Sequence, residues 1–339
     1  MQQSHQTSAF SQAAQKAPPT LILFDEHKVG TAKQCLALAS ALNQPLDAHP
    51  VCIKKPWSSL PTWLWPSPRT VLKTPLPDIL PGTLVIGGGR RSAGILAALK
   101  KEYGEEILTI QIFKGDQKPH HFDTLIAPKH DNIKVENLCS VTGALVWMDR
   151  QKIADEGKKL RDKYHLSATP YLGVLVGGST AHFKYTKRTA HYLCQAMNRW
   201  MAKTGGKCLI TTSRRTPSAV NAHLMAWAIK NECPLWVWGD GENPYTGILG
   251  AADQLLVTED SISMATECAY LGKPLYIFRV GQAPKKFKRF YTALIHNKHA
   301  ALFQGAYHFE SPRILDEGQD VAHHLHKTYP VFFQKHPVL

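Results

Sequence analysis

The chain has 339 residues with an apolar fraction of 44%, which suits two globular domains of ordinary size. Its formal net charge of +14 predicts anionic partners such as phosphates or an acidic membrane surface. The basic residues are dispersed and no nucleic-acid-binding motif accompanies them, so nucleic acid is not expected as a partner. No stretch approaches ~20 uninterrupted apolar residues, which argues against a transmembrane helix.

The N-terminus and the cysteines bear on the compartment. The first 17 residues are rich in Gln, Ser and Ala, and they lack both an apolar core and Arg. They resemble neither a secretory signal nor a transit peptide, and we expect a disordered tail over residues 1–19. The seven Cys are scattered, without a C-x-x-C motif, which is typical of reduced thiols in a cytoplasmic protein.

The first predicted strand, Leu21–Phe24, ends in a polar turn over 25–31, and a helix follows from about Ala32. Gly30 gives this turn backbone freedom, and Lys28 or His27 could meet a substrate there. A plain tight turn is the competing interpretation.

Residues 45–81 are dense in Pro and Trp, so they cannot hold long helices or central strands. Trp57 follows Lys54 and Lys55 in this segment. Trp beside Lys in a basic protein indicates a membrane-surface or lipid-acceptor patch, while internal packing of the Trp residues is the alternative.

A second strand, Leu84–Ile86, leads into Gly87, Gly88, Gly89, Arg90 and Arg91, and a helix follows over 93–101. Glycines allow the backbone to approach a ligand closely, and arginines can hold an anion. This pattern predicts a phosphate or acceptor loop. Further strands are expected at 107–113 and 124–126, and residues 141–148 form either the last strand or a connection.

The second half begins with a charged helix over 151–164, and its strands repeat one arrangement. Strands at 171–176, 208–212 and 235–238 each end in a turn rich in Gly, Ser or Arg. Because the carboxyl ends of parallel strands meet at one edge, these turns should converge. They include Gly177, Gly178, Ser179, Ser213, Arg214 and Arg215.

The stretch 253–278 is a strand, a polar turn, a helix and a second strand. Asp260, Ser261 and Ser263 suit the N-terminus of that helix, which favours phosphate, with Met264 in its first turn. Glu267 is placed to take ribose hydroxyls. An ordinary capped unit with a solvated Glu267 is an equally open interpretation.

Two later segments carry further charge. Residues 281–289 are predicted to be a basic loop, which either docks an anionic acceptor or forms a solvated surface. The helix from Gln319 carries His323, His324 and His326, for which we expect a surface face and no metal site.

These elements predict an α/β protein with two Rossmann-like, doubly wound domains facing across a cleft. We expect a tail (1–19), an acceptor domain (20–150), a helical connection (151–168), a nucleotide-sugar domain (169–318) and a C-terminal helix and tail (319–339). Arginines and helix N-termini would stabilise a departing nucleoside diphosphate in place of a metal.

The sequence also resembles the "elongated mitochondria" family of mitochondrial fission proteins, whose bacterial members are candidate glycosyltransferases. The resemblance covers roughly residue 21 to the C-terminal region. It rests on Asp240-Gly241-Glu242-Asn243-Pro244-Tyr245, the 258–264 run with Glu267, Gly272-Lys273-Pro274, the 213–217 turn and Lys286-Phe287-Lys288-Arg289-Phe290. More distantly the chain is similar to GT-B glycosyltransferases such as the one that forms lipid II.

This resemblance implies a GT-B fold and a metal-independent, inverting glycosyltransferase. It would move a sugar from a nucleotide-sugar, used as co-substrate without another cofactor, to an anionic lipid-linked or lipopolysaccharide-type glycan acceptor. We expect such a protein in the cytoplasm, peripheral on the inner membrane face. The alternatives are a non-catalytic adaptor of the fission type and a nucleotide-sugar epimerase.

One departure from the family pattern concerns catalysis. Thr31 stands where the family usually has His, a candidate base, so Glu26 or His27 would take that role. The predicted acceptor or phosphate loop therefore comprises Lys28, Gly30, Thr31, Gly87, Gly88, Gly89 and Arg90. The predicted nucleotide site comprises Gly177, Gly178, Ser179, Ser213, Arg214, Arg215, Asp260, Ser261, Ser263, Met264 and Glu267.

Overall fold

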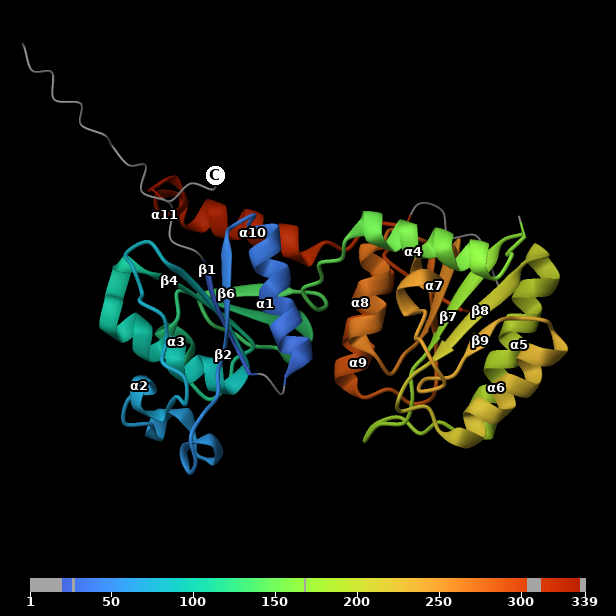
Figure 1. The fold of residues 1–339 in the computed structure, drawn as a ribbon, viewed down its shortest axis with the longest axis horizontal. Coiled ribbons are helices and arrows are strands. Elements are labelled where there is room, and N and C mark those ends of the chain that lie inside the picture. Colours follow the sequence, from blue (N-terminus) through green and yellow to red (C-terminus); the bar gives the residue numbers. More distant parts are fainter. Residues whose placement is uncertain (1–19, 26–27, 168, 304–311, 336–339) are drawn as a thin grey trace, which may run out of the picture.

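Two six-stranded sheets, one in each half of the chain, form the framework of the protein (Figure 1). The computed structural model describes residues 20–25, 28–167, 169–303 and 312–335. The tail predicted over 1–19 lies outside these residues. Every pairing between neighbouring strands is parallel. The predicted α/β class with two Rossmann-like domains is confirmed.

The first sheet has the order β2-β1-β3-β4-β5-β6. Its strands are β1 (Thr20–Phe24), β2 (Leu46–Pro50), β3 (Leu84–Gly88), β4 (Leu108–Ile112), β5 (Thr124–Pro128) and β6 (Leu138–Val141). The strands inside the sheet are buried apolar runs, as parallel sheets covered on both faces require. The Pro-flanked β2 lies at the edge, in agreement with the prediction that its segment holds no central strand.

Helices cover both faces of this sheet. One face packs against α1 (Val29–Ala41) and the C-terminal helices α10 (Glu317–Thr328) and α11 (Pro330–Lys335). The other face packs against α3 (Gly89–Tyr103) and the segment that contains α2 (Pro68–Val71). The last helices of the chain therefore complete the core of the first domain (Figure 1).

The second sheet has the order β12-β11-β10-β7-β8-β9. Its strands are β7 (Tyr171–Val176), β8 (Lys207–Thr212), β9 (Leu235–Trp236), β10 (Gln254–Thr258), β11 (Leu275–Phe278) and β12 (Ala301–Leu302). One face packs against α5 (Lys187–Thr204) and α6 (Ser218–Lys230). The other packs against α4 (Arg150–Lys163), α7 (Tyr245–Ala251), α8 (Ile262–Tyr270) and α9 (Lys285–His296).

The charged helix α4 is more than a solvated connection. Its Gly157 packs directly on α7, where an added Cβ would lie 2.4 Å from the backbone of Gly250. Ile153 and Leu160 are buried on the same side of the helix, while Lys158 and Lys159 face solvent. The expectation of a solvated face thus holds for one side of α4 only.

Two local predictions need correction, and one open alternative is decided. Gly87–Gly89 do not form a loop, because Gly87 and Gly88 end β3 and Gly89 begins α3. The basic segment predicted as a loop over 281–289 enters helix α9 at Lys285. Of the two alternatives for residues 141–148, the connection is confirmed, since β6 ends at Val141 and residues 142–149 join the domains.

Helix α9 also joins the two domains. Lys286 forms a 2.9 Å ion pair with Asp131, and the Arg289 guanidinium donates to the carbonyl of His130 at 3.3 Å. Both partners belong to the short turn Lys129–Asp131 that follows β5. Part of the basic segment thus contacts the first domain, which the sequence pattern did not predict.

Candidate functional site

The second sheet has a topological switch point between its neighbouring strands β10 and β7. The connections that follow these two strands run to opposite sides of the sheet. β7 is followed, through α5, by β8 on one side, and β10 is followed, through α8, by β11 on the other. Open α/β sheets bind ligands outside the carboxyl ends of strands at such a point. The loops that follow β7, β8 and β10 are therefore the candidate site.

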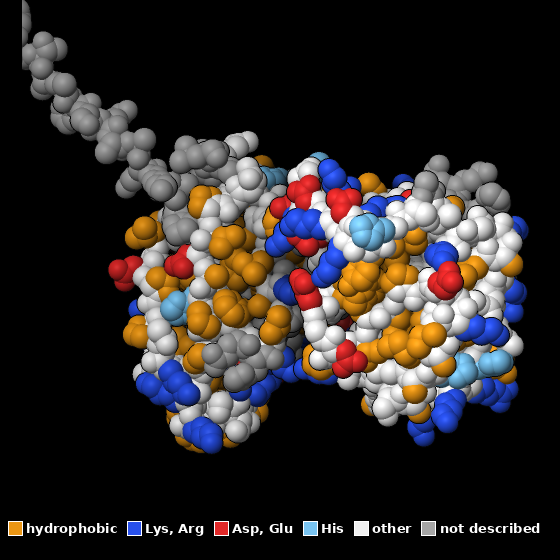
Figure 2. Space-filling model, turned by 45° about the vertical axis from the view of Figure 1, so that its right-hand side comes forward, with side chains coloured by type: hydrophobic (Ala, Val, Ile, Leu, Met, Phe, Trp, Pro, Cys, Tyr) orange, Lys and Arg blue, Asp and Glu red, His pale blue; other side chains and the backbone are white. Residues whose placement is uncertain are grey.

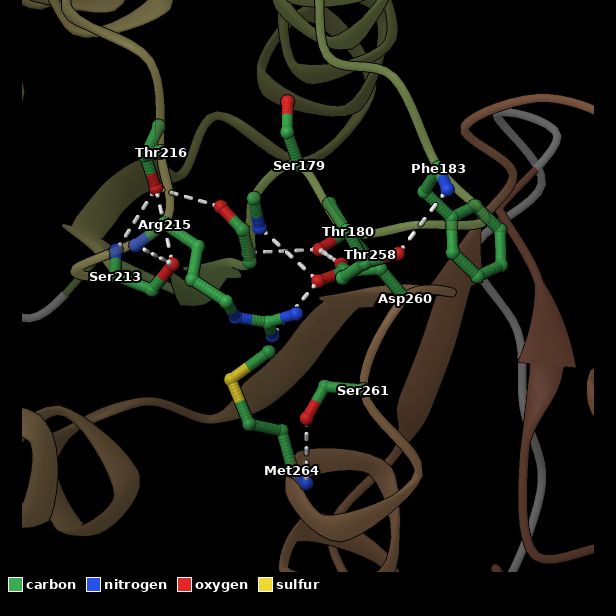
Figure 3. A network of polar contacts seen from close by, with 12 residues as sticks. Ser179, Thr180, Phe183, Ser213, Arg215, Thr216, Thr258, Asp260, Ser261 and Met264 are labelled. Atoms are coloured by element: carbon green, nitrogen blue, oxygen red, sulfur yellow. Dashed lines mark hydrogen bonds and ion pairs between the residues drawn. The ribbon is translucent and has the colours of Figure 1, made fainter.

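Asp260 lies at the centre of these loops, and its carboxylate is fully buried. It accepts hydrogen bonds from the Gly178 amide (3.0 Å), the Tyr185 hydroxyl (2.6 Å) and the Thr258 hydroxyl (2.8 Å). The Arg215 guanidinium forms an ion pair with it at 3.1 Å (Figure 3). A buried charge with this many donors is stable where an unpaired one would not be. Because its oxygens are engaged by the protein, Asp260 fixes the loops in place and is not free to contact a nucleotide as predicted.

The two glycines after β7 are dictated by this packing. A Cβ on Gly177 would lie 2.1 Å from a carboxylate oxygen of Asp260, and one on Gly178 would lie 2.1 Å from the carbonyl of Arg215. The amide of Gly177 also donates to the Thr258 hydroxyl at 2.8 Å. The backbone after β7 therefore packs directly against Asp260 and Arg215, and a residue larger than glycine has no room at either position.

The turn between β8 and α6 is held by hydroxyl groups. Thr216 donates to the carbonyl of Gly177 at 2.5 Å and accepts from the amide of Ser213 at 2.9 Å. The amide of Ser179 donates to the carbonyl of Arg215 at 3.0 Å. Arg214, at the exposed apex of this turn, lies beside the partly exposed Arg215. The turn thus presents positive charge at the crevice on a fixed backbone.

Helix α8 begins at the same crevice. The hydroxyl of Ser261 caps it by accepting from the amide of Met264 at 3.3 Å (Figure 3). Ser263 is exposed in the first turn, and Met264 is half-buried. The first amides of a helix lack intrahelical partners and favour an anion. The predicted helix N-terminus therefore meets the predicted Arg turn in space.

Glu267 lies one turn further along α8 and is half-buried. It accepts a 2.5 Å hydrogen bond from the hydroxyl of Tyr245 at the start of α7. Burial raises the pKa of the Glu267 carboxyl, while the hydrogen bond from Tyr245 and the charge of Lys33 lower it. Lys33 belongs to α1, so Glu267 faces the first domain across the cleft.

Glu259 anchors a fourth loop. Its buried carboxylate accepts from the amides of Val280 (2.7 Å) and Gly281 (3.0 Å), just beyond β11. Neighbouring acidic residues after β10 thus fix loops on both sides of that strand, which leaves little freedom in the crevice.

The equivalent crevice in the first domain lies after β1 and β3. Asp25 directly follows β1 and forms a 3.1 Å ion pair with Arg91 of α3. A Cβ on Gly88 would lie 2.3 Å from the methyl group of Thr31 and 2.9 Å from the sulfur of Cys35. Thr31, the residue that stands in place of the family His, is therefore packed against β3.

The other residues predicted for an acceptor loop are divided in space. Gly89 begins α3, and Gly30 lies exposed in the first turn of α1 with no atom near its missing Cβ. Lys28 is exposed just before that helix. Arg90 points elsewhere, because its guanidinium donates to the carbonyls of Leu60 (2.9 Å) and Ser58 (3.1 Å). The two candidate bases, Glu26 and His27, lie outside the described residues.

Sequence reasoning missed three residues that build the second crevice. Tyr245 and Thr216 lie in runs already recognised as unusual, but their roles as partners of Glu267 and Gly177 depend on the fold. Tyr185 is buried in the connection between β7 and α5, and no local pattern singles it out.

The described part of the chain bears on membrane spans and on metal sites. Among those residues no helix is both long and apolar enough to cross a bilayer. Within the same part, His, Cys, Asp and Glu do not gather in groups of three that could hold a metal ion.

Two parallel Rossmann-like domains that face each other across a cleft define the GT-B class of fold. A solved structure of this architecture, UDP-GlcNAc 2-epimerase from Methanocaldococcus jannaschii, matches 91% of this chain and 99% of its own, with a TM-score of 0.51 and 11% identity. At that identity the likeness concerns the fold alone.

The family follows from the sequence comparisons. The profile of "Mitochondrial fission ELM1" matches residues 29–329, and the chain belongs to that family. An uncharacterized protein of Rickettsia prowazekii, RP120, is 28% identical over 278 residues, covering 71% of this chain and 75% of its own. The mitochondrial fission protein ELM1 of Arabidopsis thaliana is 24% identical over 235 residues, covering 62% of this chain and 55% of its own.

Proposed function

We propose that the protein is a metal-independent, inverting glycosyltransferase that uses a nucleotide-sugar. The donor would bind residues 169–318, and the acceptor would bind residues 20–150. In this proposal the acceptor is an anionic lipid-linked or lipopolysaccharide-type glycan, reached from the cytoplasmic face of the inner membrane.

One observation carries the proposal: three loops of the second crevice are held around one buried carboxylate, an arrangement that suits a diphosphate. The loop of Gly177 and Gly178, the Arg214–Arg215 turn and the N-terminus of α8 are locked around one buried carboxylate. Preorganised donors of this kind stabilise a developing negative charge without having to reorganise. An ordinary helix cap needs only the hydrogen bond between Ser261 and Met264, and it requires neither the buried carboxylate nor the arginine turn.

The proposed chemistry assigns roles to both domains. The acceptor oxygen forms a bond to the anomeric carbon of the sugar, while the bond from that carbon to the diphosphate oxygen breaks. The electron pair stays on the nucleoside diphosphate, whose charge Arg214, Arg215 and the α8 dipole stabilise. The hydroxyl proton passes to Glu26 or His27, and Glu267 takes a ribose hydroxyl with its second oxygen.

Binding of a nucleotide is the first test, by thermal shift with UDP, ADP, GDP and CDP and their sugar conjugates. One nucleotide should raise the Tm, because a ligand that binds only the folded state stabilises it by mass action. Arg214→Gln should lower the affinity for that nucleotide by roughly tenfold or more, since hydrogen bonds to charged groups contribute about 1.5–3 kcal/mol. Arg199→Gln, an exposed arginine on α5, is the matched control. No shift with any of these nucleotides would overturn the donor site.

A non-catalytic adaptor is the second candidate, and the packing of Thr31 favours it. The side chain that replaces the family His fills the space above Gly88, which places no base at that position. An adaptor of the fission type would release no nucleoside diphosphate with any acceptor. A nucleotide-sugar epimerase, the third candidate, would convert its donor without an acceptor, so product analysis by NMR separates the three.

A further inference from the structure

A Trp-rich segment, residues 57–66, extends from the first domain beyond the end of β2. Figure 1 shows the blue chain of this region below the sheet, near α2. Its tip is the short turn Thr62–Leu64, in which Trp63 is 65% exposed and Leu64 46% exposed. Single exposed apolar residues are common. Two adjacent large apolar residues at the tip of a projection indicate an interaction surface that becomes buried against an apolar partner.

Polar contacts beneath the tip hold it rigidly. The carboxylate of Asp116 accepts hydrogen bonds from the amide (2.8 Å) and the hydroxyl (2.5 Å) of Thr62. Arg90 donates to the carbonyls of Leu60 and Ser58, as described above. Because these bonds fix the backbone on both sides of the turn, Trp63 and Leu64 are presented already ordered. Burying them therefore costs little conformational entropy.

The surroundings of the tip are positively charged. Residues 48–77 contain four basic residues and no Asp or Glu; these are Lys54, Lys55, Arg69 and Lys73. All four are exposed, and Arg69 is paired with Glu102 of α3. Figure 2 shows Lys and Arg side chains gathered on the lower lobe of the first domain. A surface of this charge repels cationic partners and attracts anionic ones.

A groove of about 550 Å³ lies between the tip and α3. Trp65, Ala97 and Ala98 line it with apolar surface, while Lys101 and His120 line it with exposed polar groups. Apolar floor and cationic side chains in one groove match the two halves of an anionic amphiphile, its chain and its headgroup.

We propose that the Trp63–Leu64 tip and this groove are the site at which the protein contacts an anionic lipid bilayer. Trp63 and Leu64 insert at the interface, and the neighbouring lysines attract the headgroups. The inference deepens the proposed function, in that it assigns the contact with the membrane to particular residues. The sequence left membrane contact and internal packing open for this segment. Trp57 and Trp65 pack against the core of the first domain, whereas the exposure of Trp63 favours membrane contact.

Co-sedimentation with vesicles tests the inference, using phosphatidylcholine alone and a 3:1 mixture with phosphatidylglycerol. The full chain should bind the mixture and not phosphatidylcholine alone. Trp63→Ser with Leu64→Ser should lower the bound fraction by about tenfold or more, since the affinity scales with buried apolar area. Lys54→Gln with Lys55→Gln should lower it by a similar factor, because each basic residue near an anionic leaflet contributes on the order of fivefold.

Trp238→Ser is the matched control, since Trp238 is 47% exposed in the second domain, far along the chain from the tip. Its binding should equal that of the wild type, and Trp63→Phe should retain most of it. The melting temperature of every variant shows whether the fold is intact. Absence of binding to the mixture, equal binding to phosphatidylcholine, or equal loss in Trp238→Ser would overturn the inference. The assay contains no nucleotide, so its failure is separate from failure of the donor site.

Discussion

The two domains share one architecture but use the crevice after their central strands differently. In the second domain a fully buried Asp260 gathers the loops after β7 and β8 and leaves Arg214 exposed. In the first domain Asp25 pairs with Arg91, and Arg90 supports the Trp-rich segment. Both crevices contain Asp and Arg, yet the Asp260 carboxylate binds three loops together and leaves an arginine exposed beside them, whereas Asp25 pairs with a single helix residue.

This difference shows that similar residues after a strand do not define a similar site. A buried carboxylate requires several donors, and those donors come from loops that are distant in sequence. Once the donors are fixed, the backbone amides and the remaining arginine have a set geometry. The proposed donor site therefore has a rigid framework in the second domain, whereas the proposed acceptor residues of the first domain are divided in space.

The largest expected effect comes from removing Asp260. Asp260→Ala leaves the buried hydroxyl of Tyr185 without its acceptor and Arg215 without its ion-pair partner, and it should destabilise the protein by about 3–5 kcal/mol. Asp25→Ala, the corresponding change in the first domain, should cost less, on the order of 1–2 kcal/mol. Urea denaturation followed by circular dichroism measures both. Equal losses would break the distinction between the crevices.

The glycines after β7 should show the next largest effect. Gly177→Ala and Gly178→Ala each force a Cβ against Asp260 or the Arg215 backbone, and overpacking of this kind costs roughly 1–3 kcal/mol. Nucleotide binding should be lost together with stability. Gly30→Ala is the matched control, because its Cβ meets no atom within 4 Å. In that helical position alanine should stabilise the protein by about 0.5–1 kcal/mol, and a loss there would contradict the packing described.

A smaller, pH-dependent effect is expected at Glu267. Burial raises its pKa above the usual value of 4.5, so the folded state holds the ionised form less favourably than the unfolded chain does. Its cost to stability is therefore absent below pH 4.5 and grows as the pH rises through the raised pKa. Glu267→Gln should raise the Tm slightly at pH 7 and leave it unchanged at pH 4.

The same variant sharpens the functional assignment of Glu267. If this carboxylate holds a ribose hydroxyl, Glu267→Gln should weaken nucleotide binding while it stabilises the fold. Glu136→Gln, at an exposed position in the first domain, is the control for both measurements. A Glu267→Gln protein that is less stable than the wild type at pH 7 would contradict the pKa argument. A variant that binds nucleotide with wild-type affinity would rule out the proposed contact between Glu267 and the ribose.

Much of the fold could be predicted because its signals are local. The apolar runs at 171–176 and 255–257 predicted buried strands, and Ser261 predicted the start of α8 through the capping bond that the structure contains. The convergence of the 177–179 and 213–215 turns followed from parallel strand order alone. These inferences needed no knowledge of which side chains touch.

The failures involve contacts between segments that are distant in sequence. The Gly87–Gly89 run has the composition of a phosphate loop, but Gly87 and Gly88 end a strand, where Thr31 and Leu96 leave no room for a Cβ. Basic residues at 285–289 have the composition of a solvated loop, but Lys286 finds Asp131 of the other domain and the segment is helical. The composition of each segment is the same whether it forms a loop or a regular element. The difference lies in the distant residues that pack against it.

The sequence by itself determined the α/β class, the two domains and the edge of the second sheet at which polar turns gather, because apolar periodicity and helix capping act over a few residues. Tertiary structure alone decided that Asp260 is a buried anchor, that Arg90 supports the Trp63–Leu64 tip and that Glu267 bonds to Tyr245. Whether a charged side chain is buried, paired or free depends on neighbours brought by the rest of the chain, and desolvation then fixes its role.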